Sequence, residues 1–460
     1  MNRLRSQSAL LAFLLMLLFW GACSKDSEPT LPTEKEFLSF QLSKELNEIP
    51  ITSVAVIEDH QVTLFLPPGT PTTDLIPEFE TPPRTSVYIG DEILISGVTV
   101  LDFSNLITAT IYAEDGTSKD YRLQLTTDFG ALDFYVDALM GDYDIPGLQL
   151  AIVKDERLVY AKSFGDADFQ QDKLVTNESL FRISGVSMPI TAIAIFKLAD
   201  MGLLDIDDRV FGEETLLGTQ YGTPPYAQDI QQITVRHLLE HTSGWTNNPS
   251  DVMFANLNQS HSELIGHVLD NRPLTTYPGT TEYVLNFGYC VLGRIIEEVA
   301  EMPYEQFVQQ ELLNPIGITA MRIGGNTQAE QYPNEVTYYD QDGSNPYWMN
   351  VTRMDSHAGW IASATDLVNF LMHIDHNPER SDLVSSNYLQ EMYFGFNYWI
   401  IHGVMPGTCA SISRLDNSFG YAILTNTRSP FDDEMLDDMN DIMKDEIWRR
   451  DRWPTYDLLD

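Results

Sequence analysis

The order of strand-like and helix-like segments constrains this fold more than any other feature of the 460-residue sequence. Residues 148–165 (LQLAIVKDERLVYAKSFG) predict two strands joined by a polar turn at 154–156. Segments with helical or loop character follow, and two further strand-like runs, TCASISRL at 408–415 and FGYAILTN at 419–426, come late. Strands first, helices in the middle and strands last predict an antiparallel sheet closed by both ends of the region, with a helical cluster against it. The predicted fold class is therefore α+β.

A smaller β domain is predicted ahead of this region. Residues 37–127 show short alternating runs, such as VAVIEDHQVTLFLP at 54–67, separated by turn clusters rich in Pro, Gly, Asp and Thr. This pattern predicts a small β-sandwich. The boundary falls at 126–134, and the helical pattern DFYVDALMGDY opens a second domain that spans 130–460. The first domain resembles the immunoglobulin-like or cadherin-like modules of Bacteroidota lipoproteins, which implies a spacer or docking role.

The N-terminus resembles a bacterial lipoprotein signal peptide over residues 1–22. Two arginines precede the apolar run Ala9–Trp20, which is too short to span a bilayer as a stable helix. Small residues then precede Cys23, which the resemblance makes the lipid-bearing first residue of the mature chain. Residues 23–36 form an acidic, Pro-containing tether. We expect a membrane partner through this lipid and a place in the cell envelope, at the outer membrane on its periplasmic or surface face. The alternative is an ordinary secretory signal.

Charge and cysteine content limit the partners and cofactors. The 27 basic and 67 acidic residues give a formal net charge of −40, which argues against nucleic acid as a partner. Beyond Cys23, the cysteines are Cys290 and Cys409, too few for a disulfide framework, and the sequence leaves open whether they pair. We find neither metal-ligand spacing nor a Gly-rich phosphate loop, so no metal or cofactor is expected.

The second domain resembles the serine β-lactamase and penicillin-binding-protein superfamily, in the branch that holds class C β-lactamases, esterases and D-aminopeptidases. Several segments in the family's order carry the resemblance: IPGLQLAIVKDERLVYAKSFG, LFRISGVSMPITA, ITVRHLLEHTSG, PGTTEYVLNFGYCVLGRIIEEV and AGWIASATDLVNF. The resemblance implies a nucleophilic serine at the start of a buried helix and a lysine one turn later. It also implies a tyrosine in a Y-x-N turn and a strand with H-x-G or K-x-G beside the cleft.

The residues that carry this chemistry are replaced. On FRISGVSMP, the family's serine falls on Gly185 and its lysine on Met188. Glycine offers no nucleophile, and methionine has about the volume of lysine but no proton to exchange. The family's tyrosine falls on Val284, while Asn286 is kept.

The third motif is the hardest to align. The family's histidine falls on Ile401, with His402 as the middle residue and Gly403 kept, although a one-residue deletion would make His402 that histidine. The apolar Val284 and Ile401 would make the former catalytic floor drier than in an active enzyme. Losing a serine nucleophile alone reduces turnover in another hydrolase by about a million-fold, or roughly 8 kcal/mol of barrier. We therefore expect no acyl-enzyme turnover by the family's mechanism.

Neighbouring residues give an alternative nucleophile. Ser184 and Ser187 flank Gly185, and Tyr283 precedes the lost tyrosine. One residue of helical offset turns a side chain by about 100°, so neither serine points where residue 185 does. We favour structural roles for these residues over an active hydrolase (an esterase, β-lactamase or D-alanyl peptidase) with rearranged catalytic groups.

The leading hypothesis is a pseudoenzyme that binds a ligand or acts as a scaffold. A peptide, glycan or peptidoglycan fragment would bind in the former catalytic cleft. Ser184, Ser187 and Tyr283 would line that cleft with Asn286, His402 and Gly403, and Trp399 would offer a stacking surface. A third hypothesis is an adhesion or assembly module.

Overall fold

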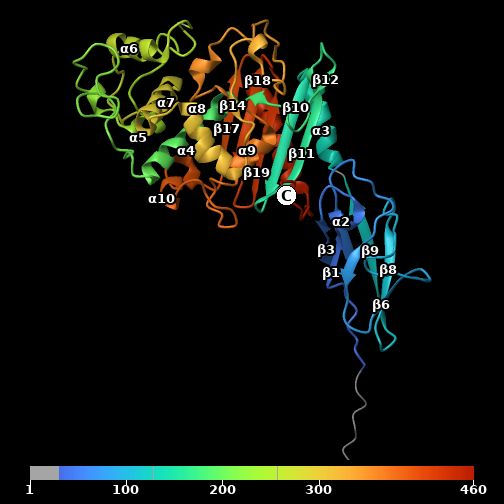
Figure 1. Cartoon of the computed structure of the whole chain (residues 1–460). Helices are drawn as coiled ribbons and strands as arrows, with labels where there is room; N and C mark the ends of the chain where they lie inside the picture. The colour runs from blue at the N-terminus through green and yellow to red at the C-terminus, as the bar shows by residue number, and fades with distance from the viewer. Residues whose placement is uncertain (1–30, 128, 256, 460) are drawn as a thin grey trace, which may run out of the picture. The chain divides into compact units, whose positions relative to one another are not determined.

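The computed structural model describes residues 31–127, 129–255 and 257–459, and Cys23 lies outside them. The chain divides into two compact units (Figure 1). The first comprises the described part of Met1–Glu48 with Val54–Leu64 and Pro71–Leu125, and the second comprises Ile49–Ser53, Phe65–Thr70 and Thr126–Asp460.

The first unit is built from short strands in a three-stranded sheet, β2-β1-β5, and a six-stranded sheet, β3-β4-β9-β8-β6-β7. Alternation buries one face, since Ala109 and Ile111 on β8 are both fully buried. The strands are β1 Ser39–Leu42, β2 Ser53–Val54, β3 Val56–Glu58, β4 Gln61–Phe65, β5 Glu78–Glu80, β6 Ser86–Ile89, β7 Glu92–Ile93, β8 Ile107–Tyr112 and β9 Ser118–Thr126.

One short helix in this unit was not predicted. Helix α2 (Lys44–Asn47) is a single turn that ends at Glu48, whose φ is 54°. The Asn47 side chain accepts from the Ile76 N–H at 2.6 Å and donates to the Ile76 carbonyl at 3.1 Å. A turn fixed by bonds to a distant segment leaves no periodic signal in the sequence.

The second unit contains the predicted antiparallel sheet, in the order β12-β11-β10-β19-β18-β17. Strand β10, near the start of the unit, pairs with β19, near its end, with Ala151 opposite Ala422. Both ends of the region therefore close the sheet, as predicted. The strands are β10 Gly147–Lys154, β11 Arg157–Asp168, β12 Lys173–Leu174, β17 Trp399–Met405, β18 Thr408–Arg414 and β19 Phe419–Thr425.

Helices cover both faces of this sheet (Figure 1). Leu148, Leu150 and Ile152 of β10 pack with helices α3 (Gly130–Asp142) and α11 (Asp432–Arg449). The alternate residues Ala151 and Val153 belong to a larger core. That core contains α4 Ser187–Asp200, α5 Val235–Leu239, α6 His261–Asn271, α7 Asn286–Ala300, α8 Tyr304–Val308, α9 Ala364–Leu371 and α10 Ser386–Leu389.

Small elements complete the unit. A three-stranded sheet has the order β13-β16-β14, and β15 pairs in parallel with β20. These strands are β13 Phe181–Arg182, β14 Arg322–Ile323, β15 Tyr339–Asp340, β16 Trp360–Ala362 and β20 Thr427–Arg428. The 3-10 helix η1 (Ser184–Val186) leads directly into α4, and η6 spans Val351–Met354. Over the described ranges, no helix combines the length and apolarity needed to cross a bilayer.

Candidate functional site

Gly185 and Met188 are the partly exposed residues of the segment that runs from β13 through η1 into the first turns of α4. Between Phe181 and Phe196, these two residues are partly exposed and all the others are buried. They lie three positions apart, so their side-chain directions share one face of the helix. The two positions at which the sequence lacks the serine and the lysine are therefore the partly exposed ones of this segment, and Met188 packs against the core that contains α4.

Arg182 fixes the strand at the start of this segment. Its side chain is fully buried, and Nη1 donates to the Pro346 carbonyl at 2.7 Å. The guanidinium also lies 4.2 Å from the centre of the Tyr338 ring, whose hydroxyl accepts from the Arg182 N–H at 3.0 Å. These contacts hold β13, and with it the start of η1, in one place.

Strand β17, at the edge of the sheet, packs directly on η1. A Cβ atom at Gly185 would lie 2.8 Å from the His402 carbonyl oxygen. A Cβ atom at Gly403 would lie 2.1 Å from the Ile183 carbonyl oxygen and 2.9 Å from the Gly185 nitrogen. The Ser184 hydroxyl donates to the Val404 carbonyl at 3.1 Å, and Ser184 has a φ of 47°. Glycine at both positions permits this backbone contact, and a side chain at residue 185 requires β17 to move.

The two serines beside Gly185 have structural partners. Ser187 is fully buried, and its hydroxyl accepts from the Trp360 N–H at 3.4 Å. The hydrogen bond of the Ser184 hydroxyl given above goes to a carbonyl, which cannot remove its proton. Among the described residues, neither hydroxyl has a hydrogen bond to a histidine, lysine, tyrosine or carboxylate side chain.

The segment before α7 is held by His241, a residue of the ITVRHLLEHTSG segment. The His241 carbonyl accepts from the Tyr283 N–H at 2.8 Å, and its Nδ1 accepts from the Leu285 N–H at 3.1 Å. Burial lowers the pKa of His241 to about 4, so the ring is neutral at pH 7 and carries its proton on Nε2. His241 is thus an anchor for the loop, a role that we had not assigned from the sequence.

The side chains on that loop differ from the expectation of a dry catalytic floor. Val284 is 62% exposed and Tyr283 is 41% exposed, because the loop runs along the surface. Asn286, which the sequence suggested as a ligand contact, donates from Nδ2 to Asp251 Oδ2 at 2.7 Å. Its amide therefore closes the start of α7 against a neighbouring loop.

Alternation along β17 separates the residues of the third motif. Ile401 packs against the core that contains α4, whereas Val404 packs against the core of α3 and α11. His402 has the parity of Val404, and the charges that act on it are Asp433, Asp437 and Lys444, all on α11. The His402 side chain therefore lies on the sheet face away from α4, and its carbonyl alone faces Gly185. This placement favours the alignment with Ile401 at the family's histidine position.

Trp399 does not provide the exposed stacking surface that we expected. Its side chain is 6% exposed, and its ring meets Phe394 edge-on at 6.1 Å. The indole is part of the apolar core at the start of β17.

The two cysteines are free and buried, which answers the question left open by the sequence. Burial raises the pKa of both the Cys290 thiol and the Cys409 thiol to about 12. Each is therefore protonated at neutral pH, and the protonated thiol is the form that is not nucleophilic. Across the described ranges, no group of three or more His, Cys, Asp or Glu side chains is arranged to hold a metal ion.

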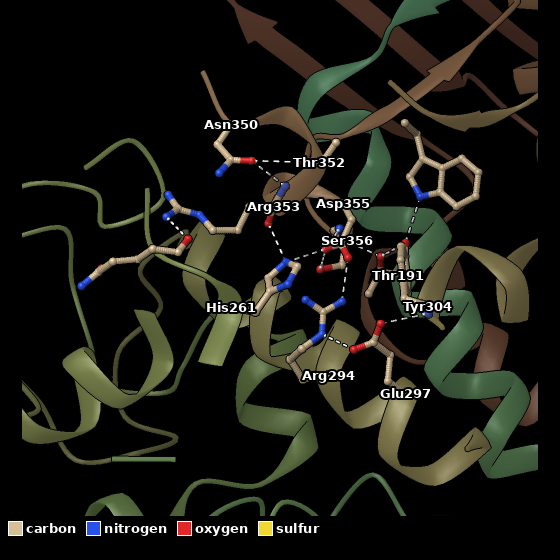
Figure 2. Close-up of polar contacts among 12 residues, drawn as sticks. Thr191, His261, Arg294, Glu297, Tyr304, Asn350, Thr352, Arg353, Asp355 and Ser356 are labelled. Atoms are coloured by element: carbon tan, nitrogen blue, oxygen red, sulfur yellow. Dashed lines mark hydrogen bonds and ion pairs between the residues drawn. The ribbon is translucent and has the colours of Figure 1, made fainter. Parts of the chain in front are cut away.

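A buried polar network supports the inner part of α4 (Figure 2). Trp360 Nε1 donates to the Tyr304 hydroxyl at 2.9 Å, and Thr191 Oγ1 lies 2.6 Å from that hydroxyl. Thr191 Oγ1 donates to the Ser356 carbonyl at 2.6 Å. The side-chain hydrogen-bonding groups of Thr191, Tyr304 and Trp360 all have partners. The network therefore ties α4 to α8 and β16.

Asp355, next to Ser356, is the centre of a charged cluster (Figure 2). It accepts from Arg294 Nη2 at 2.6 Å, and His261 Nε2 lies 3.5 Å away. Burial acts to raise the pKa of Asp355, but Arg294 and His261 hold it well below its usual range. Arg294 also meets Glu297 at 2.7 Å. No spacing or motif in the sequence marks this cluster, because its members are far apart in the chain.

Comparisons with known proteins agree with this architecture. Residues 132–444 match the family model described as Beta-lactamase. A penicillin-binding protein of Bacillus subtilis (strain 168) is 31% identical over 174 residues, 36% of this chain and 35% of that protein. PbpX of the same strain is 27% identical over 274 residues, 56% of this chain and 64% of that protein. The chain thus spans between one third and two thirds of the length of these relatives.

Solved structures share the fold. The octameric penicillin-binding protein homologue from Pyrococcus abyssi aligns with a TM-score of 0.57 and 22% identity, covering 69% of this chain and 78% of that one. The D-alanine carboxypeptidase AmpC from Burkholderia cenocepacia aligns with a TM-score of 0.53 and 20% identity, covering 68% and 98%. At these identities the match establishes the fold and leaves the chemistry to the site.

Proposed function

The chain belongs to the β-lactamase family, and we propose that it is a catalytically silent member of that family of serine hydrolases which acts by binding in the cell envelope. The observation that carries the proposal is the contact between Gly185 and β17. The family's nucleophile position has no side chain, and the His402 carbonyl lies 2.8 Å from where a Cβ atom would be. Gly185 offers neither the hydroxyl nor the space that an acyl-enzyme needs.

The other catalytic positions support the same proposal. Met188 stands in place of the lysine that would accept the serine's proton. Val284, in place of the tyrosine, is an exposed aliphatic side chain. General acid–base catalysis needs a titratable group within about 2.6–3.2 Å of the reacting proton, and none of these side chains titrates.

The role that we propose is non-covalent recognition of a peptide, glycan or peptidoglycan fragment, or scaffolding of an envelope assembly. The support is the retained framework around an altered catalytic face. The exposed Tyr283 and Val284 offer an aromatic and an aliphatic surface on that framework. A thermal-shift screen against muropeptides, penicillins and oligosaccharides should give a concentration-dependent rise in Tm for one class.

The test of catalytic silence uses covalent probes on the purified full chain. A fluorescent penicillin and a fluorophosphonate should leave no adduct, both by gel fluorescence and by intact mass. Ser184→Ala and Ser187→Ala are made in parallel. Saturable labelling of the wild type that one of these variants abolishes would instead establish an active hydrolase with a displaced nucleophile.

We also propose that the protein is attached to the membrane by a lipid on Cys23. The support is the sequence alone: a basic start, a short apolar run and small residues before the cysteine. In bacteria, the wild type should fractionate with membranes and incorporate labelled fatty acid. Cys23→Ala should do neither, and an unchanged distribution would argue for an ordinary secretory signal.

A further inference from the structure

Two adjoining cavities lie at the end of the large sheet where β18 turns into β19. The larger, of about 510 Å³, and a small one of about 10 Å³ share Asp375, Arg414 and Asn417 as lining residues. The larger is within the size range of small-molecule sites. Neither is lined by Gly185, Met188 or any other residue of the former catalytic positions.

The wall of the larger cavity is rich in side-chain amides. Asn377, Gln390, Asn397 and Asn417 all line it. Each amide offers two N–H donors and a carbonyl acceptor, so the wall presents both kinds of group to a ligand. Gln390 and Asn397 are exposed, and no side-chain hydrogen bond is found for either within the described part of the chain.

A buried carboxyl pair forms the floor of the small cavity. Glu156, at the turn between β10 and β11, is 7% exposed, and its Oε2 has no hydrogen-bond partner among the described residues. Asp375 is 5% exposed and accepts from the Asn377 N–H at 2.9 Å. Burial and the neighbouring Asp375 raise the pKa of Glu156 to about 9. At neutral pH this carboxyl is protonated, with Asp375 as its side-chain hydrogen-bond partner, and Oε2 remains as an acceptor.

Arg414 adds a cationic donor group that lacks a strong partner. It is 4% exposed, and its bonds to the Asp416 carbonyl and Asn417 Oδ1 are long, at 3.3 and 3.5 Å. A guanidinium has five N–H groups, so donors remain for a ligand. The segment that supplies Gly395 and Asn397 also carries Phe396 and Tyr398, which are 65% and 55% exposed.

We propose that these cavities form a carbohydrate-binding site for a neutral hexose or short oligosaccharide. Sugar hydroxyls donate and accept at once, which matches the amides of the wall and the Glu156 Oε2 atom of the floor, which has no hydrogen-bond partner among the described residues. The exposed rings beside Asn397 offer apolar surface for the C–H face of a sugar. A divalent cation fits less well, because Arg380 donates to the Glu156 carbonyl at 3.0 Å and Arg414 lines both cavities.

Saccharide binding at these cavities is independent of whether the protein is catalytically active, and the test measures binding only. The purified full chain is titrated by calorimetry with glucose, galactose, mannose, N-acetylglucosamine and their β-1,4- and α-1,4-linked oligomers. At least one series should bind saturably. Gln390→Ala and Asn397→Ala should each weaken that binding by about tenfold, the value of one good hydrogen bond. Gln310→Ala, an exposed glutamine on another helix, is the matched control and should change nothing.

The floor is tested by two substitutions of one residue. Glu156→Gln keeps both a donor and an acceptor and should retain binding within about twofold, whereas Glu156→Leu should abolish it. Thermal unfolding of each variant verifies that it is folded. The proposal is overturned if no saccharide in the panel binds saturably, or if the wall variants bind as the wild type does. Binding of CaCl₂ alone, lost in Asp375→Asn, would also overturn it in favour of a cation site.

Discussion

Gly185, Met188 and Thr191 follow one another at three-residue spacing along η1 and α4, and the two ends of this row differ in their chemistry. Gly185 and Met188 form the outer end, where residues are partly exposed and no side chain exchanges a proton. Thr191, three residues further, is the inner end, fully buried and bonded to Tyr304 and Ser356. The difference shows that the buried network of Thr191, Tyr304 and Ser356 holds α4 in place without any side chain from the family's catalytic positions. The packing of α4 therefore depends on other residues than those at the family's catalytic positions.

The largest effect on the free energy of unfolding is expected from breaking the charged cluster of Asp355 and Arg294, which adjoins the inner end at Thr191. Asp355→Ala leaves Arg294, 5% exposed on its side chain, without its carboxylate at 2.6 Å. Removing one partner of a buried ion pair costs about 3–5 kcal/mol, and we expect that loss in urea unfolding of the second unit. Lys444→Met, which removes an exposed pair with Asp441, should change the free energy of unfolding by less than about 0.5 kcal/mol. Equal effects for the two variants would show that the cluster does not support α4.

The next effect is a pH dependence that comes from the same region. His357 is fully buried, and burial lowers its pKa from 6.5 to about 3. The groups that act on it are Asp355, His261 and Arg353. Because the unfolded chain binds the proton first, the free energy of unfolding should fall as pH drops from 6.5 towards 3. At pH 4.5 the loss from this group is about 2–3 kcal/mol.

His357→Gln separates that contribution from the other titrating groups. The variant has no proton to bind at this position, so its stability should fall less than that of the wild type between pH 7 and pH 4.5. Parallel pH profiles for the two proteins in chemical denaturation would mean that His357 is not buried in its neutral form.

A smaller effect is expected at the outer end, where backbone contact replaces side chains. Gly403→Ala places a Cβ atom 2.1 Å from the Ile183 carbonyl and should lower stability by about 1–3 kcal/mol. Gly185→Ala meets the His402 carbonyl at 2.8 Å and should cost less. Gly141→Ala is the opposite control, because its helical site is open and alanine should add about 0.5–1 kcal/mol. If all three variants were equally stable in thermal unfolding, β17 would not be seated against η1.

The sheet of the second unit could be predicted from the sequence. The strand-like patterns at 148–165 and 408–426 predicted the strands of this sheet. In the structure, alternate residues of these strands pack against different helices on the two faces of the sheet. The flanking residues of FRISGVSMP set the register that assigns the family's serine and lysine positions to Gly185 and Met188, and this assignment stays a prediction. The prediction of the sheet is confirmed, because it rests on local periodicity.

The predictions that failed concern contacts between distant segments. The face of β17 that carries His402 depends on how the strand pairs and packs, which the sequence does not specify. Trp399 was expected to offer a stacking surface, but its ring packs against Phe394 in the core. Val284 was expected in a dry floor and lies on the surface. The cluster of Asp355 with Arg294 joins residues 61 positions apart, and no spacing in the chain marks it.

The claim that the catalytic face cannot form an acyl-enzyme is tested most directly by restoring its two missing groups together. The double variant Gly185→Ser/Met188→Lys is incubated with a fluorescent penicillin and measured by intact-mass spectrometry. We predict no mass increase, because the Cβ position at residue 185 conflicts with the His402 carbonyl at 2.8 Å and Val284 supplies no proton. A stoichiometric mass increase equal to one penicillin would contradict the account and show that the framework still holds a working site.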